Sequence, residues 1–244
     1  MDTRKDTILI TGGGSGIGRA MAEALHDRGA KVIIAGRRRE ALEAVVAANP
    51  GMAFQTLDVA DPAAIRDFAA GVVEAHPDLN VLINNAGVMV AEDQIDLAIA
   101  EQTVAINLLG PIRLTAALLP HLKSKPRASV VTVSSGLAFV PLAATPTYSA
   151  TKAAIHSWSQ SLRHQLRATS VEVIEWAPPA VATDLMPGHA DNPNSMPLAD
   201  FTAESLALFE AGHEEVLVER VKFLSGAADR GEYGEVFRTL NPVG

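Results

Sequence analysis

Two side chains that could carry acid–base chemistry lie four residues apart, Tyr148 and Lys152, in the stretch Tyr-Ser-Ala-Thr-Lys at the start of a predicted helix. Residues four apart share one face of a helix, so the lysine would lie beside the phenol. An ammonium group there stabilises the phenolate, and we expect it to lower the pKa of Tyr148 from its usual value of about 10. The pair would then exchange protons near neutral pH.

Three further polar residues could take part. Ser134 ends a predicted strand and Ser135 follows it, at the edge of a parallel sheet where ligands bind, and either hydroxyl could orient a reacting oxygen. Asn107 interrupts an otherwise apolar helical segment, and a polar side chain in that setting must find hydrogen-bond partners. The plainer alternative for Asn107 is a bond to a local backbone carbonyl.

A glycine-rich loop lies near the start of the chain. Residues 11–18 read Thr-Gly-Gly-Gly-Ser-Gly-Ile-Gly, between a predicted strand and a predicted helix. Glycines there allow a tight turn and let phosphate approach the backbone at a helix N-terminus, which attracts negative charge. No Gly-Lys-Ser or Gly-Lys-Thr is present, so the pattern predicts a dinucleotide site and not a P-loop. The residues that would line this site are Gly12, Gly14, Ser15, Gly16, Ile17 and Gly18.

The residues at the end of the second predicted strand indicate which dinucleotide the protein would bind. An acidic side chain there would bind the ribose 2′-hydroxyl of NAD, whereas a basic one would suit the 2′-phosphate of NADP. The strand is followed by Arg37 and Arg38, and the first acidic residue is Glu40. A guanidinium fork matches phosphate, so we expect NADP(H), with Arg37 as the leading contact. NAD(H) stays possible, because arginines at a helix start can simply face water.

The elements that must position these residues alternate along the chain. Short apolar runs separated by helical patterns predict a doubly wound parallel sheet of about seven strands, with helices on both faces, in a single α/β domain of the Rossmann type over residues 1–244. Residues 183–202 hold several prolines and little periodicity, which predicts a substrate lid. The expected strands are 7–11, 31–35, 53–57, 81–83, 129–134, 171–176 and 215–218, and the expected helices include 38–48, 97–124, 148–168, 203–213 and 235–240.

Composition narrows the function classes. The formal net charge is −8, which disfavours nucleic acid and anionic membrane as partners. The chain has no cysteine, so disulfides, thiolate metal sites and cysteine nucleophiles are excluded, and its seven histidines show no spacing typical of a metal site. No apolar run reaches the roughly 20 residues that span a bilayer, and no signal peptide is evident at the first residues. We expect a soluble cytoplasmic protein without a metal.

The spacing Thr-Gly-x-x-x-Gly-x-Gly resembles that of the short-chain dehydrogenase/reductase family. Further stretches match in order between about residues 7 and 183. Asp58 and Val59 fall where the family contacts the adenine, and residues 84–87 read Asn-Asn-Ala-Gly, as in its cofactor-side motif. The resemblance adds Asn85, Ala86, Gly87, Pro178, Val181 and Thr183 to the expected cofactor contacts, together with Tyr148 and Lys152.

The resemblance also implies a mechanism. Ser135 lies thirteen residues before Tyr148, the family's spacing, which favours it over Ser134. Tyr148 would protonate the oxygen of a small carbonyl substrate, or deprotonate an alcohol, while Ser135 positions that oxygen and hydride passes to or from the cofactor. Lys152 would contact the nicotinamide ribose, and Asn107 would support a water-linked proton relay. We therefore expect an oxidoreductase that acts on small carbonyl or alcohol compounds.

The chain departs from the family after the sixth predicted strand. The usual Pro-Gly is here Pro178-Pro179, and proline lacks the backbone N–H that glycine would offer to the nicotinamide carboxamide. This form, with Thr183-Asp184-Leu185 after it, is similar to the branch named for a proposed role in D-alanine esterification of teichoic acid, the DltE-like branch. The family's glycine-rich ending is also absent, although a homodimer or homotetramer is still implied.

Two other functions fit part of the sequence. The first is a redox-sensing protein that binds nicotinamide but is catalytically silent, although it would have no need for an intact serine–tyrosine–lysine set. The second is a sugar-nucleotide epimerase, although these are longer and have a larger substrate region. The substrate is not specified, but apolar residues near the expected site suggest an apolar pocket, namely Phe139, Val140, Leu142, Leu185, Met186 and Met196.

Overall fold

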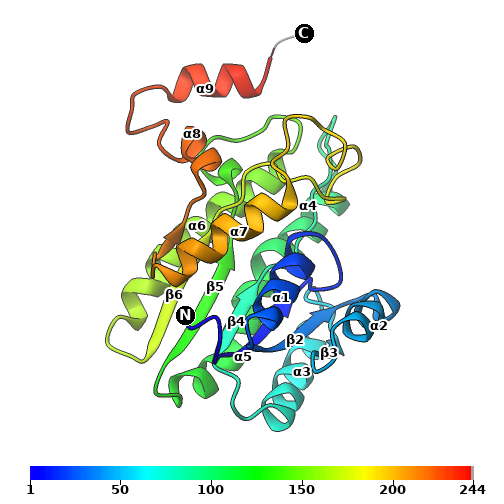
Figure 1. The fold of residues 1–244 in the computed structure, drawn as a ribbon. Coiled ribbons are helices and arrows are strands. Elements are labelled where there is room, and N and C mark those ends of the chain that lie inside the picture. Colours follow the sequence, from blue (N-terminus) through cyan, green and yellow to red (C-terminus); the bar gives the residue numbers. More distant parts are fainter. Residues whose placement is uncertain (243–244) are drawn as a thin grey trace.

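Seven parallel strands form one sheet in the order β3-β2-β1-β4-β5-β6-β7 (Figure 1). The structure is a computed structural model that describes residues 1–242. Because β1 lies between β2 and β4, the sheet winds in both directions from its centre, which confirms the predicted fold class. The strands are β1 (Thr7–Thr11), β2 (Lys31–Gly36), β3 (Ala53–Thr56), β4 (Val81–Asn84), β5 (Ala128–Val133), β6 (Val171–Trp176) and β7 (Glu215–Val216).

Helices cover both faces of the sheet (Figure 1). One face carries α1 (Gly16–Asp27), α2 (Arg39–Ala48) and α7 (Leu198–Glu210), and the other carries α3 (Pro62–Ala75), α5 (Gly110–Lys123) and α6 (Pro146–Leu166). The remaining elements are α4 (Leu97–Val104), the π-helical turn η1 (Ala105–Leu109), the 3₁₀ turns η2 (Gly136–Ala138) and η3 (Glu219–Val221), α8 (Lys222–Ser225) and α9 (Tyr233–Leu240). Helices α8 and α9 lie beyond the carboxyl ends of the strands.

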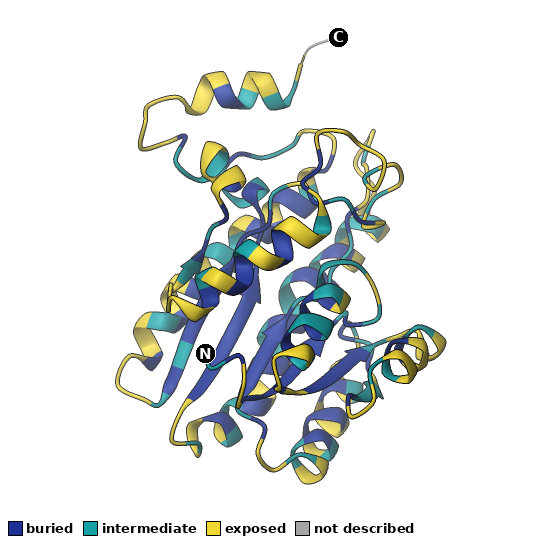
Figure 2. Ribbon diagram, viewed as in Figure 1, coloured by how far each residue is buried: buried dark blue, intermediate teal, exposed yellow. Residues whose placement is uncertain are grey.

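The strands are apolar along most of their length because both faces of the sheet are covered. All residues of β1 and β5 are buried, and the sheet forms the dark centre of the molecule in Figure 2. Successive side chains point to opposite faces, so Ile8 and Ile10 join the core under α1, while Leu9 joins the core under α3 and α5.

Short-range signals fixed several helix ends. The Asp61 carboxylate accepts hydrogen bonds from the backbone N–H groups of Ala63 and Ala64 at 2.7 and 3.2 Å, so it caps α3, whose first residue is Pro62. Gly29 follows α1 with a φ of 103°, a left-handed conformation that favours glycine after a helix. Helix starts and stops of this kind depend on two or three neighbouring residues, which is why sequence locates them well.

Three predicted boundaries were wrong. The helix expected over 97–124 is a run of α4, η1 and α5, in which five residues adopt a π turn. Helix α7 begins at Leu198 and not at 203, so the last residues of the predicted 183–202 lid are helical. The last strand is only the two residues of β7. Each difference depends on packing against distant elements, which local patterns do not record.

The run from Leu97 to Lys123 also corrects an expectation about length and polarity. It is 27 residues long, and its most apolar 18-residue stretch has a mean hydropathy of 1.4, so by length and composition alone it could cross a membrane. In the fold it packs against α3 and α6, and 44% of its most apolar stretch is buried. Its apolar residues are therefore those of a helix that covers a sheet. Such a helix can be as long and as apolar as one that crosses a membrane.

Trp176, at the end of β6, is the largest fully buried side chain. Its ring stacks on Phe201 of α7 with centroids 5.4 Å apart and meets Phe209 edge-on at 5.5 Å. Its indole N–H donates to the hydroxyl of Ser205 at 3.0 Å. Helix α7 is thus fixed to the sheet by an aromatic cluster, and Ser205 of the same helix accepts the hydrogen bond of the Trp176 indole N–H.

We predict that Ser205→Ala lowers the free energy of unfolding by about 1–3 kcal/mol, because it leaves the buried indole N–H without an acceptor. Urea unfolding followed by tryptophan fluorescence measures the change. Ser161→Ala, which removes an exposed hydroxyl from α6, is the control and should change stability by less than about 0.5 kcal/mol. Equal effects of the two substitutions would contradict this account of α7.

Candidate active site

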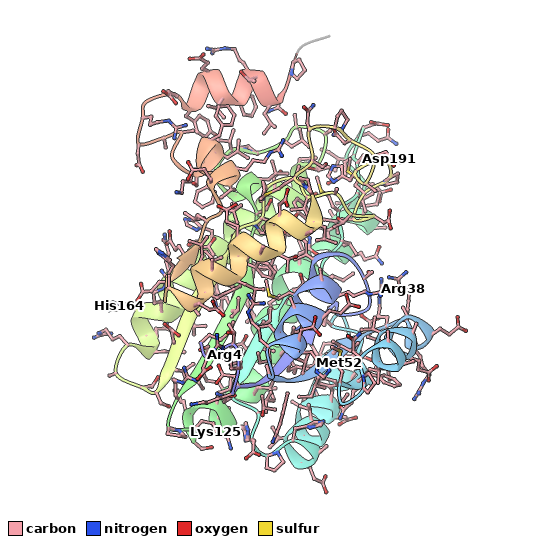
Figure 3. The ribbon with its side chains drawn as sticks, viewed as in Figure 1. Arg4, Arg38, Met52, Lys125, His164 and Asp191 are labelled. Atoms are coloured by element: carbon pink, nitrogen blue, oxygen red, sulfur yellow. The ribbon has the colours of Figure 1, made fainter. Side chains whose placement is uncertain are left out.

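A cavity of about 650 Å³ opens at the carboxyl ends of the strands. Asp191, in the loop before α7, lies at this end of the molecule, whereas Lys125 lies at the other (Figure 3). With the exception of Asn107, all the predicted site residues line this one cavity: Gly12, Gly14, Ser15, Gly16, Ile17, Gly18, Arg37, Arg38, Asp58, Val59, Asn85, Ala86, Gly87, Ser135, Tyr148, Lys152, Pro178, Val181 and Thr183. Residues spread over most of the chain thus meet where a parallel α/β sheet binds its ligands.

The glycine loop needs glycine for two separate reasons. Gly12 and Gly16 have φ values of 70° and 54°, which side chains rarely adopt. Gly18 lies against the Asn85 side chain and the Gly12 backbone. A Cβ at this position would lie 2.3 Å from the Asn85 amide nitrogen and 2.5 Å from the Gly12 carbonyl oxygen. At Gly14 a Cβ would meet its nearest neighbour at 3.4 Å, so that position is only moderately crowded.

Thr11 and Asn85 tie this loop to the end of β4. The Thr11 hydroxyl accepts from the backbone N–H groups of Asn85 and Ala86 at 3.0 Å each, and the Asn85 amide donates to the Thr11 carbonyl at 2.9 Å. The neighbouring Asn84 amide donates to the Thr115 hydroxyl of α5 at 3.0 Å. The asparagine pair therefore fixes two cavity walls to each other and to the helix layer.

Arg37 and Arg38 lie where β2 ends, beside the glycine loop. Arg38 donates from its guanidinium to the Ser15 hydroxyl at 2.9 Å. That hydroxyl belongs to the residue just before α1, at the positive end of the helix. Two guanidinium groups and a helix N-terminus therefore meet on one rim of the cavity, where they favour an anionic group.

Asn107 sits in the π turn η1, just outside the cavity lining. Its side-chain oxygen accepts from the Val88 N–H at 2.9 Å, and its amide donates to the Val88 carbonyl at 2.8 Å and to the Thr151 hydroxyl at 3.4 Å. Its partners lie far away in the chain, so the alternative of a bond to a local carbonyl is wrong. The amide holds the segment after β4 against helix α6, and its link to a water stays a prediction.

Tyr148 and Lys152 lie side by side on the first turns of α6, and both are buried. The Lys152 ammonium donates to the Val133 carbonyl at the end of β5, at 2.8 Å, and lies 5.5 Å from the centre of the tyrosine ring. Burial raises the pKa of Tyr148 to about 12, and a hydrogen bond with Ser135 acts in the opposite direction. Burial also lowers the pKa of Lys152 to about 8.

The sequence expectation for the pKa of Tyr148 was therefore wrong in direction. It counted the nearby lysine but not the loss of water around the phenol, and in this cavity the second effect is larger. The two candidate serines have different partners. The Ser135 hydroxyl is bonded to Tyr148, whereas the Ser134 hydroxyl donates to the Glu175 carboxylate at 2.5 Å.

Comparison with known proteins agrees with this geometry. A family model described as short chain dehydrogenase matches residues 6–194. The chain belongs to the short-chain dehydrogenase/reductase family. Within it, the chain belongs to the DltE-like branch: it is 39% identical over 249 aligned residues to the uncharacterized oxidoreductase DltE of Bacillus subtilis, covering 99% of this chain and 98% of that protein.

Solved structures of this family share the fold. A short-chain dehydrogenase from Burkholderia cenocepacia, in complex with NADP, is similar with a TM-score of 0.85 and 27% identity, over 97% of this chain and 99% of that one. A short-chain dehydrogenase from Streptomyces avermitilis gives a TM-score of 0.80 and 30% identity, over 96% and 97% of the two chains.

The departure from the short-chain dehydrogenase/reductase pattern at Pro179 lies in the cavity wall. The Pro178 carbonyl accepts from the Gly136 N–H at 2.9 Å, so the first proline is tied to the turn that follows Ser135. Val181 then forms a bridge with Met196, which closes the base of the 183–197 loop.

Sequence reasoning missed part of the substrate side of the cavity. Of the six apolar residues suggested for it, Leu142 and Leu185 line the cavity, while Val140 and Met196 are core residues. Leu224 and Leu240, from the α8–α9 region, complete this wall, and His189 of the 183–197 loop adds a polar group. Their only signal was apolar spacing in a segment whose helices could not be fixed from sequence.

We predict that Gly18→Ala destabilises the protein by about 1–3 kcal/mol and weakens nucleotide binding, because the added methyl group must displace the backbone of Gly12. Gly71→Ala is the matched control: it also adds one methyl group to a helix, but nothing lies within 4 Å, so it should stabilise by about 0.4–1 kcal/mol. Urea unfolding of both variants measures this. If the two substitutions had effects of the same sign, the close approach at Gly18 would be disproved.

Proposed function

We propose that this short-chain dehydrogenase/reductase transfers hydride between NADP(H) and a small apolar carbonyl or alcohol compound, with Tyr148 as the acid–base group. The observation that carries the proposal is the buried Tyr148 phenol, bonded to Ser135 and beside Lys152, in the same cavity as the glycine loop. Leu142, Leu185, Leu224 and Leu240 support an apolar substrate.

The residues of the cavity suit a nicotinamide dinucleotide. Gly12 and Gly16 shape a loop whose backbone N–H groups can meet a pyrophosphate at the start of α1, and Arg37 and Arg38 suit a 2′-phosphate. When bound, such a cofactor supplies the hydride chemistry that no side chain of this protein can provide. The B. cenocepacia relative, whose structure is a complex with NADP, supports a nicotinamide cofactor, and the preference for NADP(H) rests on Arg37 and Arg38.

In the direction of carbonyl reduction, Tyr148 acts as the proton donor. Its raised pKa of about 12 keeps the phenol protonated at neutral pH, ready to donate to a substrate oxygen. The Ser135 hydroxyl forms a second hydrogen bond with the substrate oxygen and orients the phenol O–H. The buried Lys152 ammonium stabilises the phenolate that remains, and the apolar walls exclude water from the reacting groups.

We expect Arg37→Asp to weaken NADPH binding by tenfold or more, because a carboxylate would repel the 2′-phosphate, while NADH binding stays within about threefold. Titration of the purified protein with each nucleotide, followed by fluorescence, measures both affinities. Arg39→Asp, at the exposed first residue of α2, is the matched control and should leave both affinities almost unchanged. No binding of either nucleotide to the unaltered protein would refute the proposed function.

Tyr148→Phe should reduce carbonyl turnover by about 10²–10⁴-fold, the usual contribution of a general acid, without weakening NADPH binding. Tyr233→Phe is the matched control because Tyr233 is the other tyrosine, and it lies exposed on α9. Consumption of NADPH with a panel of apolar aldehydes and ketones measures turnover. Normal turnover in Tyr148→Phe would exclude this residue as the acid, and NADPH binding without any turnover would favour the silent sensor.

A further inference from the structure

A buried carboxylate lies behind the catalytic residues and takes no part in the mechanism above. Glu175 of β6 has a side chain that is 1% exposed. Its oxygens accept from the Ser134 hydroxyl at 2.5 Å and contact the His156 imidazole Nδ1 at 2.8 and 3.0 Å. A carboxylate buried near the end of a sheet strand is costly unless it is paired and hydrogen-bonded, and Glu175 is both.

The two partners of Glu175 belong to the two elements that carry the catalytic groups. Ser134 stands between Val133, whose carbonyl accepts from Lys152, and Ser135, which is bonded to Tyr148. His156 lies on α6 one turn after Lys152, on the same face of the helix. Glu175 therefore joins the end of β5 to α6 directly behind the catalytic groups.

We propose that Glu175 and His156 are positioning residues, which hold Ser135 and Lys152 in register with Tyr148 while His156 is protonated and loosen them when it is neutral. This inference rests on the proposed function, since it concerns the same site. With a charged imidazole the carboxylate is part of an ion pair. With a neutral imidazole it is a buried anion held only by neutral donors, a far weaker arrangement.

The surroundings of His156 are accessible enough for it to titrate. Its side chain is 22% exposed, it packs against the Phe139 ring with centroids 4.8 Å apart, and its second nitrogen faces the Gln160 amide at 3.2 Å. The imidazole thus connects a fully buried carboxylate to the protein surface, where protons are exchanged with water.

The charged groups around the pair come from few elements. Glu215 of β7 favours protonation of His156, and Arg163 on α6 opposes it. Lys152 lies one turn before His156, and His164 lies two turns after it on the same helix. The other elements that pack against α6, namely α4, η1, η2, β5 and β6, add only Glu101 of α4, which is exposed, and Glu172 at the far end of β6.

The direction of the pH effect follows from the hydrogen bond. The bond with Glu175 raises the pKa of His156 above its ordinary value of about 6.5, although partial burial acts in the opposite direction. The stabilisation by the ion pair is therefore complete below that ordinary value and is lost as the pH rises through the raised pKa. Turnover in the direction of reduction should fall over the same range, far below the pKa of about 12 of Tyr148.

The first test compares two glutamates of the same strand. Glu175→Gln should lower kcat by about tenfold at neutral pH, abolish the alkaline fall in kcat, and leave KM for NADPH within about twofold. Glu172→Gln removes the carboxylate that pairs with the chain N-terminus at the other end of β6, and should keep the unaltered pH profile. His156→Asn should behave as Glu175→Gln does, which guards against a folding defect in one variant.

The profile must also be assigned to His156 and not to Lys152, whose pKa burial lowers to about 8. Histidine ¹⁵N NMR gives the midpoint of His156 directly, and the kcat profile should share it. An alkaline fall that persists unchanged in Glu175→Gln, or a kcat for Glu175→Gln equal to that of Glu172→Gln, would overturn the inference.

A second readout needs no turnover. In Tyr233→Phe protein the only tyrosine is Tyr148, so a ¹³Cζ-tyrosine label gives one resonance from the site. We expect this resonance to shift with pH at the midpoint of His156, and to stay flat in that range when Glu175→Gln is added. A flat resonance in the unaltered Glu175 background would overturn the inference even in an active enzyme. Absence of any carbonyl turnover would instead defeat the proposed function and leave this measurement to decide on Glu175.

Discussion

The hydrogen bond from Lys152 to the Val133 carbonyl joins helix α6 to strand β5, and the arrangement of the candidate site depends on it. Lys152 is buried, and its ammonium group must find an acceptor inside the protein. The carbonyl at the end of β5 provides one, which fixes the first turns of α6 over the edge of the sheet. Tyr148, one turn earlier, is thereby placed against Ser135, two residues beyond the carbonyl. The same burial that requires this bond also separates the two pKa values, lowering that of Lys152 and raising that of Tyr148.

Burial of these groups requires support from the layers around them. Polar contacts near the cavity supply it: Thr11 with Asn85 joins the ends of β1 and β4, Asn107 joins Val88 to Thr151 of α6, and Glu175 with Ser134 joins β6 to the end of β5. Each contact links segments far apart in the chain. The cavity walls are therefore set by polar contacts at the edge of an apolar sheet, a division of roles that lets loop residues vary while the core keeps its packing.

Much of this arrangement could be predicted from the sequence, because the signals are local. The glycine loop, the apolar strands, the Asp61 cap and the Tyr148–Lys152 spacing each depend on a few neighbouring residues. What could not be predicted depends on distance in space. The pKa of Tyr148 follows from its burial, and the π turn at Asn107 packs against α6 and bonds Val88 in the segment after β4. Leu224 and Leu240 reach the cavity only through the course of α8 and α9.

Glu175 shows where local patterns stop being informative. Strand β6 reads Val-Glu-Val-Ile-Glu-Trp, and its two glutamates look alike in sequence. One lies at the amino end of the strand, is 38% exposed and meets the chain N-terminus, as expected of a charge near solvent. The other lies three residues further on, at the end of the strand that faces the cavity, and is fully buried. A charge in such a place, paired with a histidine on α6, agrees better with the proposed positioning role than with a role in stability, since an apolar pair of similar volume would serve stability equally well.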